Sequence, residues 1–315
     1  MRVRYVYALV FVLIASIGFF GLQDAGVVNL SSAYSYLAGI FFAEKITPDA
    51  IRSEYANSSL KVLIVPGHEK DTGGTEYKNL KERELVLQLG KYLQEELNKD
   101  THLTSQITRD GSGDFTQWFK DYIAEGSIDV KVFTTSAKVK TAQAIIQGLF
   151  TPTTGVEHNT APGPTALVLY GINKYANEHA VDLVLHLHLN DYPRRYTNQP
   201  GKYTGFAIYI PESQLPNTRS SKAIGDSIAR ELAHIEPRSS YKKEQPALVE
   251  DQELIAIGSY GTRDGASLLI EYGYIYEKKF TDLKLRDKTL RDLAHATYLG
   301  IEDYFNQKVA LSTTR

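Results

Sequence analysis

Apolar residues are distributed along the chain in two alternating patterns. Short apolar runs, typical of buried strands, occur at residues 61–65, 105–108, 181–189, 205–210 and 267–271. Stripes with the spacing of an amphipathic helix lie between and after them, at residues 80–97, 165–179, 220–235 and 287–305. Because strands that alternate with helices are typical of an α/β fold, we predict a single twisted, largely parallel sheet with helices on both faces.

The region after the second predicted strand follows neither pattern well. Residues 111–164 contain Gly, Thr and Pro in groups, for example at 151–155 and 161–164, which indicates loops. Within this region we predict one helix, near residues 137–149. The sequence therefore predicts one folded domain at 61–310 with an insertion at about 111–178.

The N-terminus has the features of a segment that enters a membrane. Arg2 and Arg4 precede a run over residues 5–22 that contains no charged residue, a pattern typical of exported proteins. The residues after this run match a cleavage site poorly, so a signal anchor at 1–25 is favoured over a removed signal peptide. Residues 26–60 are expected to form a juxtamembrane helix and linker, with the rest of the chain outside the cytoplasm.

Composition and charge narrow the possible functions. With 43% hydrophobic and 23% charged residues, the chain is ordinary for a globular protein. Its formal charge of −2 and the lack of any long Lys/Arg cluster argue against nucleic acid as a partner. Because the chain has no cysteine, disulfides, thiolate zinc sites and a cysteine nucleophile are excluded. Any metal must therefore be held by histidines and carboxylates.

Four ionisable residues stand at equivalent places in the predicted fold. His68 follows the first strand, and Glu82 begins the helix after it. His188 lies near the end of the third strand, and Glu271 ends the fifth. Because the carboxyl ends of parallel strands meet at one edge of a sheet, these side chains can converge. Two imidazoles and one carboxylate are a ligand set of catalytic zinc, beside which a second carboxylate can act as a base.

Each of these residues also has an ordinary explanation. His68 can be a loop residue, and Glu82 can be a surface charge near the positive end of a helix dipole. His186 and His188 are harder to explain, because both face one side of an apolar strand and need polar partners if buried. Position alone also admits other ligands, namely Glu69, Glu76, Glu84 and His186.

Read in order, these motifs resemble the zinc-dependent N-acetylmuramoyl-L-alanine amidases, bacterial cell-wall hydrolases of the amidase-3 family. The resemblance spans about residues 61–305. The segments that carry it are Val65-Pro66-Gly67-His68, residues 82–87, Thr108-Arg109-Asp110, residues 182–190 and residues 269–274. In residues 82–87, the first glutamate stands five residues before the leucine, as in the family's Glu-Lys-x-x-Asn-Leu. Residues 182–190 resemble the end of the family's Ala-Asp-x-x-x-Ser-x-His-x-Asn.

The resemblance implies roles for individual residues. It implies that His68, Glu82 and His188 bind one zinc ion, with Glu82 rather than Glu84 as the carboxylate ligand. It also implies that Glu271 is the catalytic acid and base.

Three further residues are candidates for contact with substrate or for support of the ligands. Arg109 and Asn190 belong to the matching motifs, and His186 stands where the family usually has serine. His186 could be an alternative ligand, but its position two residues before His188 favours a supporting or substrate-contacting role. The 111–178 insertion is longer than compact members need, and it could be a lid, a segment that covers the zinc or a decorated loop.

The function that the resemblance implies is hydrolysis of the amide bond between N-acetylmuramic acid and L-alanine in peptidoglycan. Such an enzyme would act in the cell envelope, in wall remodelling or daughter-cell separation, held to the membrane by its N-terminus. One alternative is a zinc peptidase that acts on another envelope substrate. The other is an envelope-binding protein that has the fold without activity. A regulatory activator is a further expected partner, although the sequence does not identify one.

Overall fold

The computed structural model describes residues 43–70, 73–158, 160–191, 196 and 198–306. The membrane helix predicted within 1–25 lies outside these residues, as does the first part of the segment predicted at 26–60. Over the described ranges, no helix combines the length and the apolar character needed to cross a bilayer. The described chain enters the domain through a helix, α3 (Pro48–Asn57), in which Thr47 caps the N-terminus by accepting a hydrogen bond from the Ala50 backbone at 3.1 Å.

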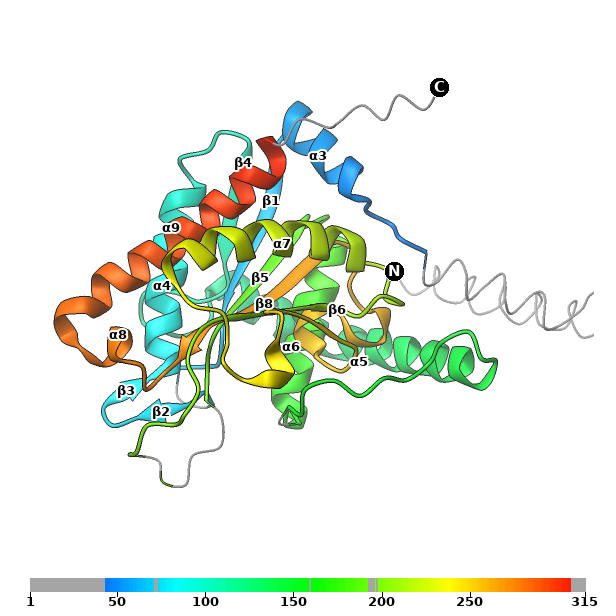
Figure 1. The fold of residues 1–315 in the computed structure, drawn as a ribbon. Coiled ribbons are helices and arrows are strands. Elements are labelled where there is room, and N and C mark those ends of the chain that lie inside the picture. The colour runs from blue at the N-terminus through cyan, green and yellow to red at the C-terminus, as the bar shows by residue number, and fades with distance from the viewer. Residues whose placement is uncertain (1–42, 71–72, 159, 192–195, 197, 307–315) are drawn as a thin grey trace, which may run out of the picture.

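Six strands form one sheet in the order β4-β1-β5-β8-β6-β7 (Figure 1). Their bounds are β1 Leu60–Pro66, β4 Leu103–Ile107, β5 Leu183–Asn190, β6 Ala207–Pro211, β7 Leu248–Asp251 and β8 Ala266–Tyr274. The first four strands in this order are mutually parallel, whereas β6 runs antiparallel to β8 and parallel to β7. The predicted largely parallel sheet is confirmed. The sequence did not predict β7, because its two apolar residues are followed directly by Glu250 and Asp251.

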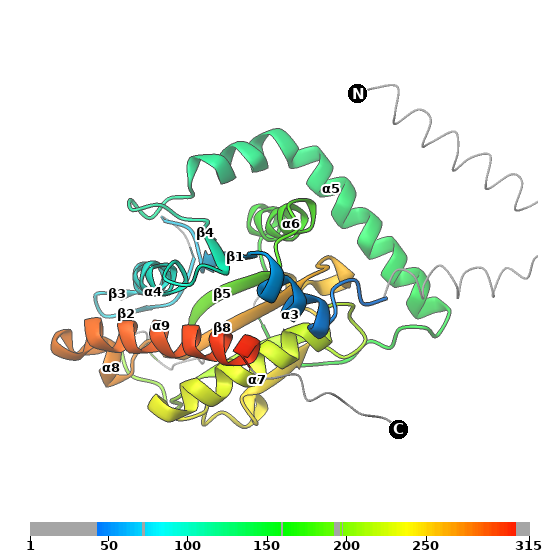
Figure 2. The ribbon, with the colours of Figure 1, turned by 90° about the horizontal axis from the view of Figure 1, so that it is seen from above.

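Helices cover both faces of this sheet, as predicted (Figure 2). One face carries α4 (Glu82–Leu97), α7 (Thr218–Ile235) and α9 (Leu283–Asn306). The other face carries α5 (Gln117–Ile146) and α6 (Gly163–Glu178). The shorter elements are β2 Glu76–Tyr77, β3 Leu80–Lys81, α8 Lys278–Thr281 and the 3-10 turns η1 Lys242–Glu244, η2 Ile255–Ile257 and η3 Ser259–Gly261.

Strand β1 shows how the sheet divides the core. Val62 and Ile64 join the cluster under α4, α7 and α9, whereas Leu63 and Val65 join the cluster under α6. Successive side chains of a strand point to opposite faces, so a strand that is covered on both sides must be apolar throughout. This requirement explains why the central strands appear in the sequence as continuous apolar runs.

Helix α5 differs from the prediction for this region. A helix was expected only near 137–149, but α5 begins at Gln117 and extends for 30 residues. Its apolar residues occupy two sides of the helix, with Val130 buried and Val132 exposed, so no single helical stripe stands out. Helix α6 packs on the sheet, which means that only part of the 111–178 region extends away from the core.

The crossing of α7 and α9 yields a test of packing. A Cβ atom added to Gly300 of α9 would lie 2.4 Å from the Ile228 Cα of α7, so the two helices would have to separate. We expect Gly300→Ala to lower the free energy of unfolding by about 1–3 kcal/mol in urea denaturation. Gly126→Ala in α5 is the matched control, because its added Cβ meets no atom within 4 Å. That control should gain about 1 kcal/mol from helix propensity. Equal effects of the two substitutions would contradict the packing argument.

Candidate metal centre

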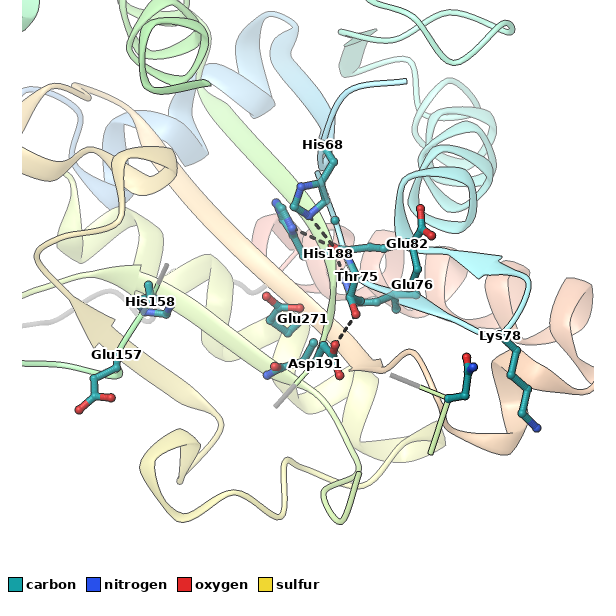
Figure 3. A pocket seen from close by; sticks show the side chains of 14 residues that line it. His68, Thr75, Glu76, Lys78, Glu82, Glu157, His158, His188, Asp191 and Glu271 are labelled. Carbon is teal, nitrogen blue, oxygen red and sulfur yellow. Dashed lines mark hydrogen bonds and ion pairs between the residues drawn. The ribbon is translucent and has the colours of Figure 1, made fainter. Parts of the chain in front are cut away.

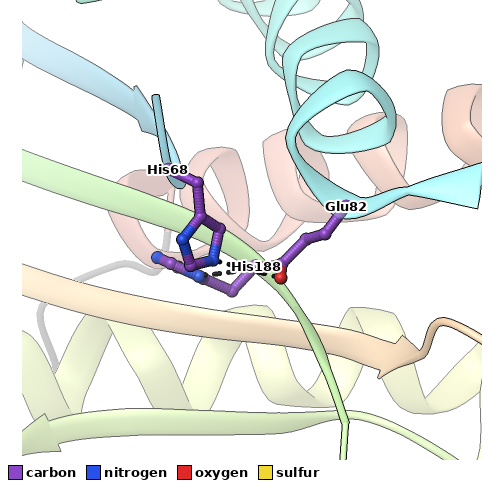
Figure 4. Close-up of side chains that lie close together, drawn as sticks. All are labelled: His68, Glu82 and His188. Carbon is purple, nitrogen blue, oxygen red and sulfur yellow. Dashed lines mark hydrogen bonds and ion pairs between the residues drawn. The ribbon is translucent and has the colours of Figure 1, made fainter. Parts of the chain in front are cut away.

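Three of the predicted residues converge at the carboxyl edge of the sheet (Figure 4). His68 follows β1, Glu82 is the first residue of α4, and His188 lies near the end of β5. One potential ligand atom from each lies within 4.8 Å of the other two. The imidazole rings of His68 and His188 meet nearly edge to face, with their centroids 4.9 Å apart. His68 and His188, which are 120 residues apart in the sequence, therefore lie in one cluster. They can do so because β1 and β5 are parallel and end at the same edge of the sheet.

Glu82 is the centre of this cluster and is only 3% exposed. One carboxylate oxygen lies 3.0 Å from His188 Nδ1, and the other lies 3.1 Å from His68 Nε2. The same two oxygens accept backbone hydrogen bonds from Leu189 at 3.0 Å and Thr75 at 2.8 Å. Burial by itself would raise the pKa of Glu82, but the hydrogen bonds to His188 and His68 hold it well below its usual range. Glu82 is therefore ionised at neutral pH.

The backbone around His68 is shaped to fit the two imidazoles. His68 itself has a positive φ of 65°, and a Cβ atom on the preceding Gly67 would lie 2.4 Å from the His188 ring. A Cβ atom on Gly74 would lie 2.9 Å from the His68 ring. These close approaches explain why glycine precedes the first histidine, and they fix the distance between the two rings.

Arg109 supports this loop from within the protein. It is 2% exposed, and its Nη1 donates to the backbone oxygens of Gly67 at 3.1 Å and Arg83 at 2.9 Å. Its remaining donors contact the Gly113 oxygen at 2.8–2.9 Å. All these acceptors belong to the backbone, so the geometry favours a supporting role for Arg109 over substrate contact.

Glu271 stands beside the cluster on the neighbouring strand. It is the direct register partner of His188 in the β5–β8 pairing. Within the described part of the chain, its Oε2 atom is buried and has no hydrogen-bond partner. Burial raises the pKa of Glu271 well above its usual range, and the negative charges of Glu82 and Glu244 add to the shift. Glu271 is therefore poised to hold a proton.

A cavity of about 750 Å³ connects these residues (Figure 3). Its lining is mostly polar and consists of His68, Gly74, Thr75, Glu76, Lys78, Glu82, Glu157, His158, His188, Leu189, Asn190, Asp191, Asn198 and Glu271. The predicted residue Asn190 lies in this lining and donates to Glu244 at 2.5 Å. A polar cavity at the carboxyl edge of a parallel sheet is where an α/β protein binds its ligand.

His186 is not part of the cavity wall. It is 1% exposed, and burial lowers its pKa to about 3, so its imidazole is neutral. Its Nε2 atom has no hydrogen-bond partner among the described residues, and it is absent from the metal-ligand cluster. His186 therefore lies on β5 two residues before His188, outside both the cavity lining and the metal-ligand cluster.

The residues of the cluster suit a zinc ion. Two imidazoles and one carboxylate are a ligand set of catalytic rather than structural zinc sites, and all three residues line the cavity. The negative charge of Glu82 contributes to the raised pKa of Glu271 in the same cavity, and a divalent cation bound there would offset that charge. His68, Glu82 and His188 are thus the residues that could hold a metal.

The profile of the N-acetylmuramoyl-L-alanine amidase family matches residues 62–303. The chain belongs to this family of amidases. The resemblance found in its motifs is confirmed, and so is the enzyme class. In a comparison with curated proteins, no match was found.

Solved structures show the same fold. The amidase Ami1 from Mycobacterium smegmatis aligns with a TM-score of 0.52 at 13% identity, over 79% of this chain and 98% of Ami1. The CwlD amidase from Clostridioides difficile, solved in complex with the GerS lipoprotein, aligns with a TM-score of 0.50 at 15% identity, over 78% of this chain and 98% of CwlD. At such low identity the likeness concerns the fold of the amidase domain alone.

Sequence reasoning missed two carboxylates of this amidase's site. Glu244 is 2% exposed and accepts hydrogen bonds from Tyr209 at 2.8 Å and Tyr274 at 3.0 Å, as well as from Asn190. Asp251, at the end of β7, is 2% exposed and lies 3.1 Å from Nε2 of His158. Neither residue belongs to a motif, and Glu244 lies in a polar stretch, so the sequence carried no signal for their burial.

His158 was also missed, although it lines the amidase's cavity. It belongs to the loop after α5, and the neighbouring Val156 packs into a cluster with Tyr209 and Leu269. The His158 ring contacts Tyr209, with the ring centroids 5.1 Å apart. A histidine in a stretch of Thr, Pro and Gly gave no reason to place it beside strands that lie far away in the sequence.

The close approach of Gly67 to His188 is testable. We expect Gly67→Ala to displace the His188 ring and lower the amidase's affinity for zinc at least about 10-fold, measured by competition with a chelating dye. Gly111→Ala is the control, because its added Cβ meets no atom within 4 Å and should leave zinc binding unchanged. Circular dichroism shows whether both variants are folded. A folded Gly67→Ala protein with wild-type zinc affinity would refute this geometry.

Proposed function

We propose that this amidase hydrolyses the amide bond between N-acetylmuramic acid and L-alanine in peptidoglycan, with one zinc ion held by His68, Glu82 and His188. The observation that carries the proposal is the convergence of these side chains on a polar cavity that also contains Glu271. Family membership supports peptidoglycan as the substrate class, and the set of two imidazoles and one carboxylate supports zinc as the metal.

When bound at such a site, zinc acts as a Lewis acid on the amide carbonyl and lowers the pKa of water. The protein contributes the fixed geometry of the ligands. Glu82 brings a negative charge, held in place by the backbone amides of Leu189 and Thr75. His68 and His188 are held at a set separation by the close packing of Gly67 and Gly74.

Glu271 is proposed to move the proton. Its carboxylate would accept a proton from the attacking water as the oxygen adds to the amide carbon, and would then deliver it to the departing alanine nitrogen as the C–N bond breaks. Two features support this role: the buried Oε2 has no competing hydrogen-bond partner in the described chain, and burial raises the pKa of the carboxyl. A carboxylate with a raised pKa is a stronger base. Its protonated form also persists near neutral pH, so it can then deliver the proton.

His158 is proposed to contact the substrate from the other side of the cavity. Its ring is held by buried Asp251 and by the face-to-edge contact with Tyr209. An imidazole that donates its Nε2–H to a buried carboxylate presents Nδ1 in a set direction, where it can accept a hydrogen bond. The polar character of the cavity suits a glycopeptide, which offers many hydroxyl and amide groups.

Peptidoglycan lies outside the cytoplasm, so the proposed activity places the enzyme in the cell envelope. A role in wall remodelling or daughter-cell separation belongs to this proposal, as does membrane attachment through the charge-free run at residues 5–22. A zinc peptidase acting on another envelope substrate and a binding protein without activity are the rival functions. Digestion of purified peptidoglycan separates them, because only the proposed amidase releases intact stem peptides from muramic acid.

Substitutions of Glu271 and His188 test the division of roles. We expect Glu271→Gln to lower peptidoglycan cleavage by about 1,000-fold or more while zinc remains bound, because only the proton-transfer group is lost. His188→Ala should lose both cleavage and zinc, since a ligand is removed. Cleavage is followed by mass analysis of released stem peptides, and zinc by elemental analysis.

The control for these variants is Glu84→Gln, which changes an exposed glutamate in the same turn as Glu82. It should retain both cleavage and zinc. Chelation should abolish cleavage by the wild-type enzyme, and added zinc should restore it. An active Glu271→Gln enzyme would show that another group moves the proton.

The proposed substrate contact of His158 is tested by His158→Gln and Asp251→Asn. Both variants should lower kcat/KM for peptidoglycan fragments by about 10- to 100-fold without loss of zinc, because the ring is absent or no longer oriented. His234→Gln, at a largely exposed histidine of α7, is the control and should have wild-type kinetics. Wild-type kinetics in His158→Gln would remove His158 from the site.

A further inference from the structure

One side of α5 is an exposed apolar surface. The residues at positions 128, 132, 135, 139, 142 and 146 follow one another at alternating steps of four and three, which places them on one side of the helix. Residue 149 follows just beyond the helix end. These residues are Ile128, Val132, Thr135, Val139, Ala142, Ile146 and Leu149, and we call them the α5 stripe. All seven are exposed, and the exposed fraction reaches 73% for Ile128 and 84% for Ile146.

The opposite side of the same helix packs against the protein. Val130, Ala137 and Ala144 repeat every seven residues and are at most 5% exposed. The inner side of α5 therefore packs on the domain, whereas the α5 stripe is exposed, with Val132 and Thr135 bordering hollows that α6 also lines. Among the described residues, eleven large apolar side chains are exposed, and five of them belong to this stripe. Such a concentration of exposed apolar residues indicates a surface that binds a partner.

The charges along the α5 stripe beyond its first turn are basic, whereas Glu125 and Asp129 lie beside its N-terminal end. Residues 130–156 contain Lys131, Lys138 and Lys140 but no aspartate or glutamate. Lys131 and Lys138 line a hollow between α5 and α6. Lys140 lines a second hollow, on the other side of α5, which also contains Asp129, Glu178 and Asp264. Lysines therefore flank the stripe on both sides, and its partner should be apolar and anionic.

The described chain begins beside this helix. Lys45 lines the same hollow as Val132, Phe133 and Lys140 of α5, so the first described residues lie next to the stripe. Figure 2 shows α5 extending along the border of the molecule, whereas α3 lies nearer the middle of the view, between α6 and α7. In the sequence, the charge-free run at residues 5–22, which is predicted to enter a membrane, precedes these first described residues.

From these observations we propose that the α5 stripe rests on the surface of an anionic lipid bilayer. An amphipathic helix with an apolar face between lysines binds at such a surface, with its apolar side chains among the acyl chains and its lysines at the headgroups. A second copy of the chain fits less well, because pairing two stripes would bring two sets of lysines together without any acidic partner in residues 130–156.

The experiment uses the full chain, which contains no cysteine, so one engineered cysteine can carry a polarity-sensitive fluorophore. The label is placed in the stripe by Val139→Cys, or by Lys288→Cys at an exposed position of α9 on the opposite face of the sheet. Each labelled protein is mixed with vesicles of phosphatidylglycerol and phosphatidylcholine in equal parts, or of phosphatidylcholine alone. Lipids brominated on their acyl chains serve as quenchers.

We expect the label at position 139 to shift to the blue and to be quenched in the anionic vesicles, whereas the label at position 288 remains in water. Lys131→Glu/Lys138→Glu/Lys140→Glu in the Val139→Cys protein should weaken this contact by roughly 100-fold, since each lysine near an anionic surface contributes several-fold to binding. Circular dichroism checks that this variant is folded.

Three results would overturn the proposal. The first is a label at position 139 that stays in water when the anionic vesicles are present, whether or not the chain binds them elsewhere. The second is equal quenching at position 139 in the neutral and anionic vesicles, which would remove the role of the lysines. The third is a blue shift that depends on protein concentration without lipid, which would identify a second copy as the partner.

Discussion

The site depends on one buried carboxylate, that of Glu82. A charge that is removed from water must be compensated, and here two imidazoles and two backbone amides supply the compensation. The compensating groups come from three segments: the loop after β1, the turn before β2 and the end of β5, which supplies both His188 and the Leu189 amide. Holding Glu82 in place therefore brings these three segments together, and the segments in turn place His68 and His188.

Two further carboxylates near the site, those of Glu271 and Glu244, differ in how they are compensated. Among the residues that the structure describes, Glu271 Oε2 has no hydrogen-bond partner, whereas Glu244 accepts hydrogen bonds from Tyr209, Tyr274 and Asn190. The two glutamates are close enough for the charge of Glu244 to raise the pKa of Glu271. The fully hydrogen-bonded carboxylate is thus a structural anchor, and the unsatisfied one faces the cavity, where chemistry needs an available base.

Under the two proposals, the same domain meets two different surfaces of the cell envelope. The cavity lies at the carboxyl edge of the sheet, and the α5 stripe lies on a helix beside the first described residues. The 111–178 region supplies both α5 and the loop that carries His158 to the cavity. Whether that region acts as a lid stays a prediction, but its helix α6 is part of the layer that covers the sheet.

The sequence by itself determined the layers and most of the proposed site. Continuous apolar runs at β1, β5 and β8 revealed strands buried on both faces, and local motifs at their ends identified His68, Glu82, His188 and Glu271. Only the tertiary structure decided how far α5 extends and that β7 is a strand. It also decided the burial of Glu244 and Asp251 and the position of His158 at the cavity. In each of these cases the contacting residues are distant in sequence. Helix α5 has apolar residues on both a packed and an exposed side, and buried Asp251 contacts His158 from another segment of the chain. Periodicity and motifs predict which side of a segment is buried. The burial of a single polar residue depends instead on which distant group forms a hydrogen bond or ion pair with it.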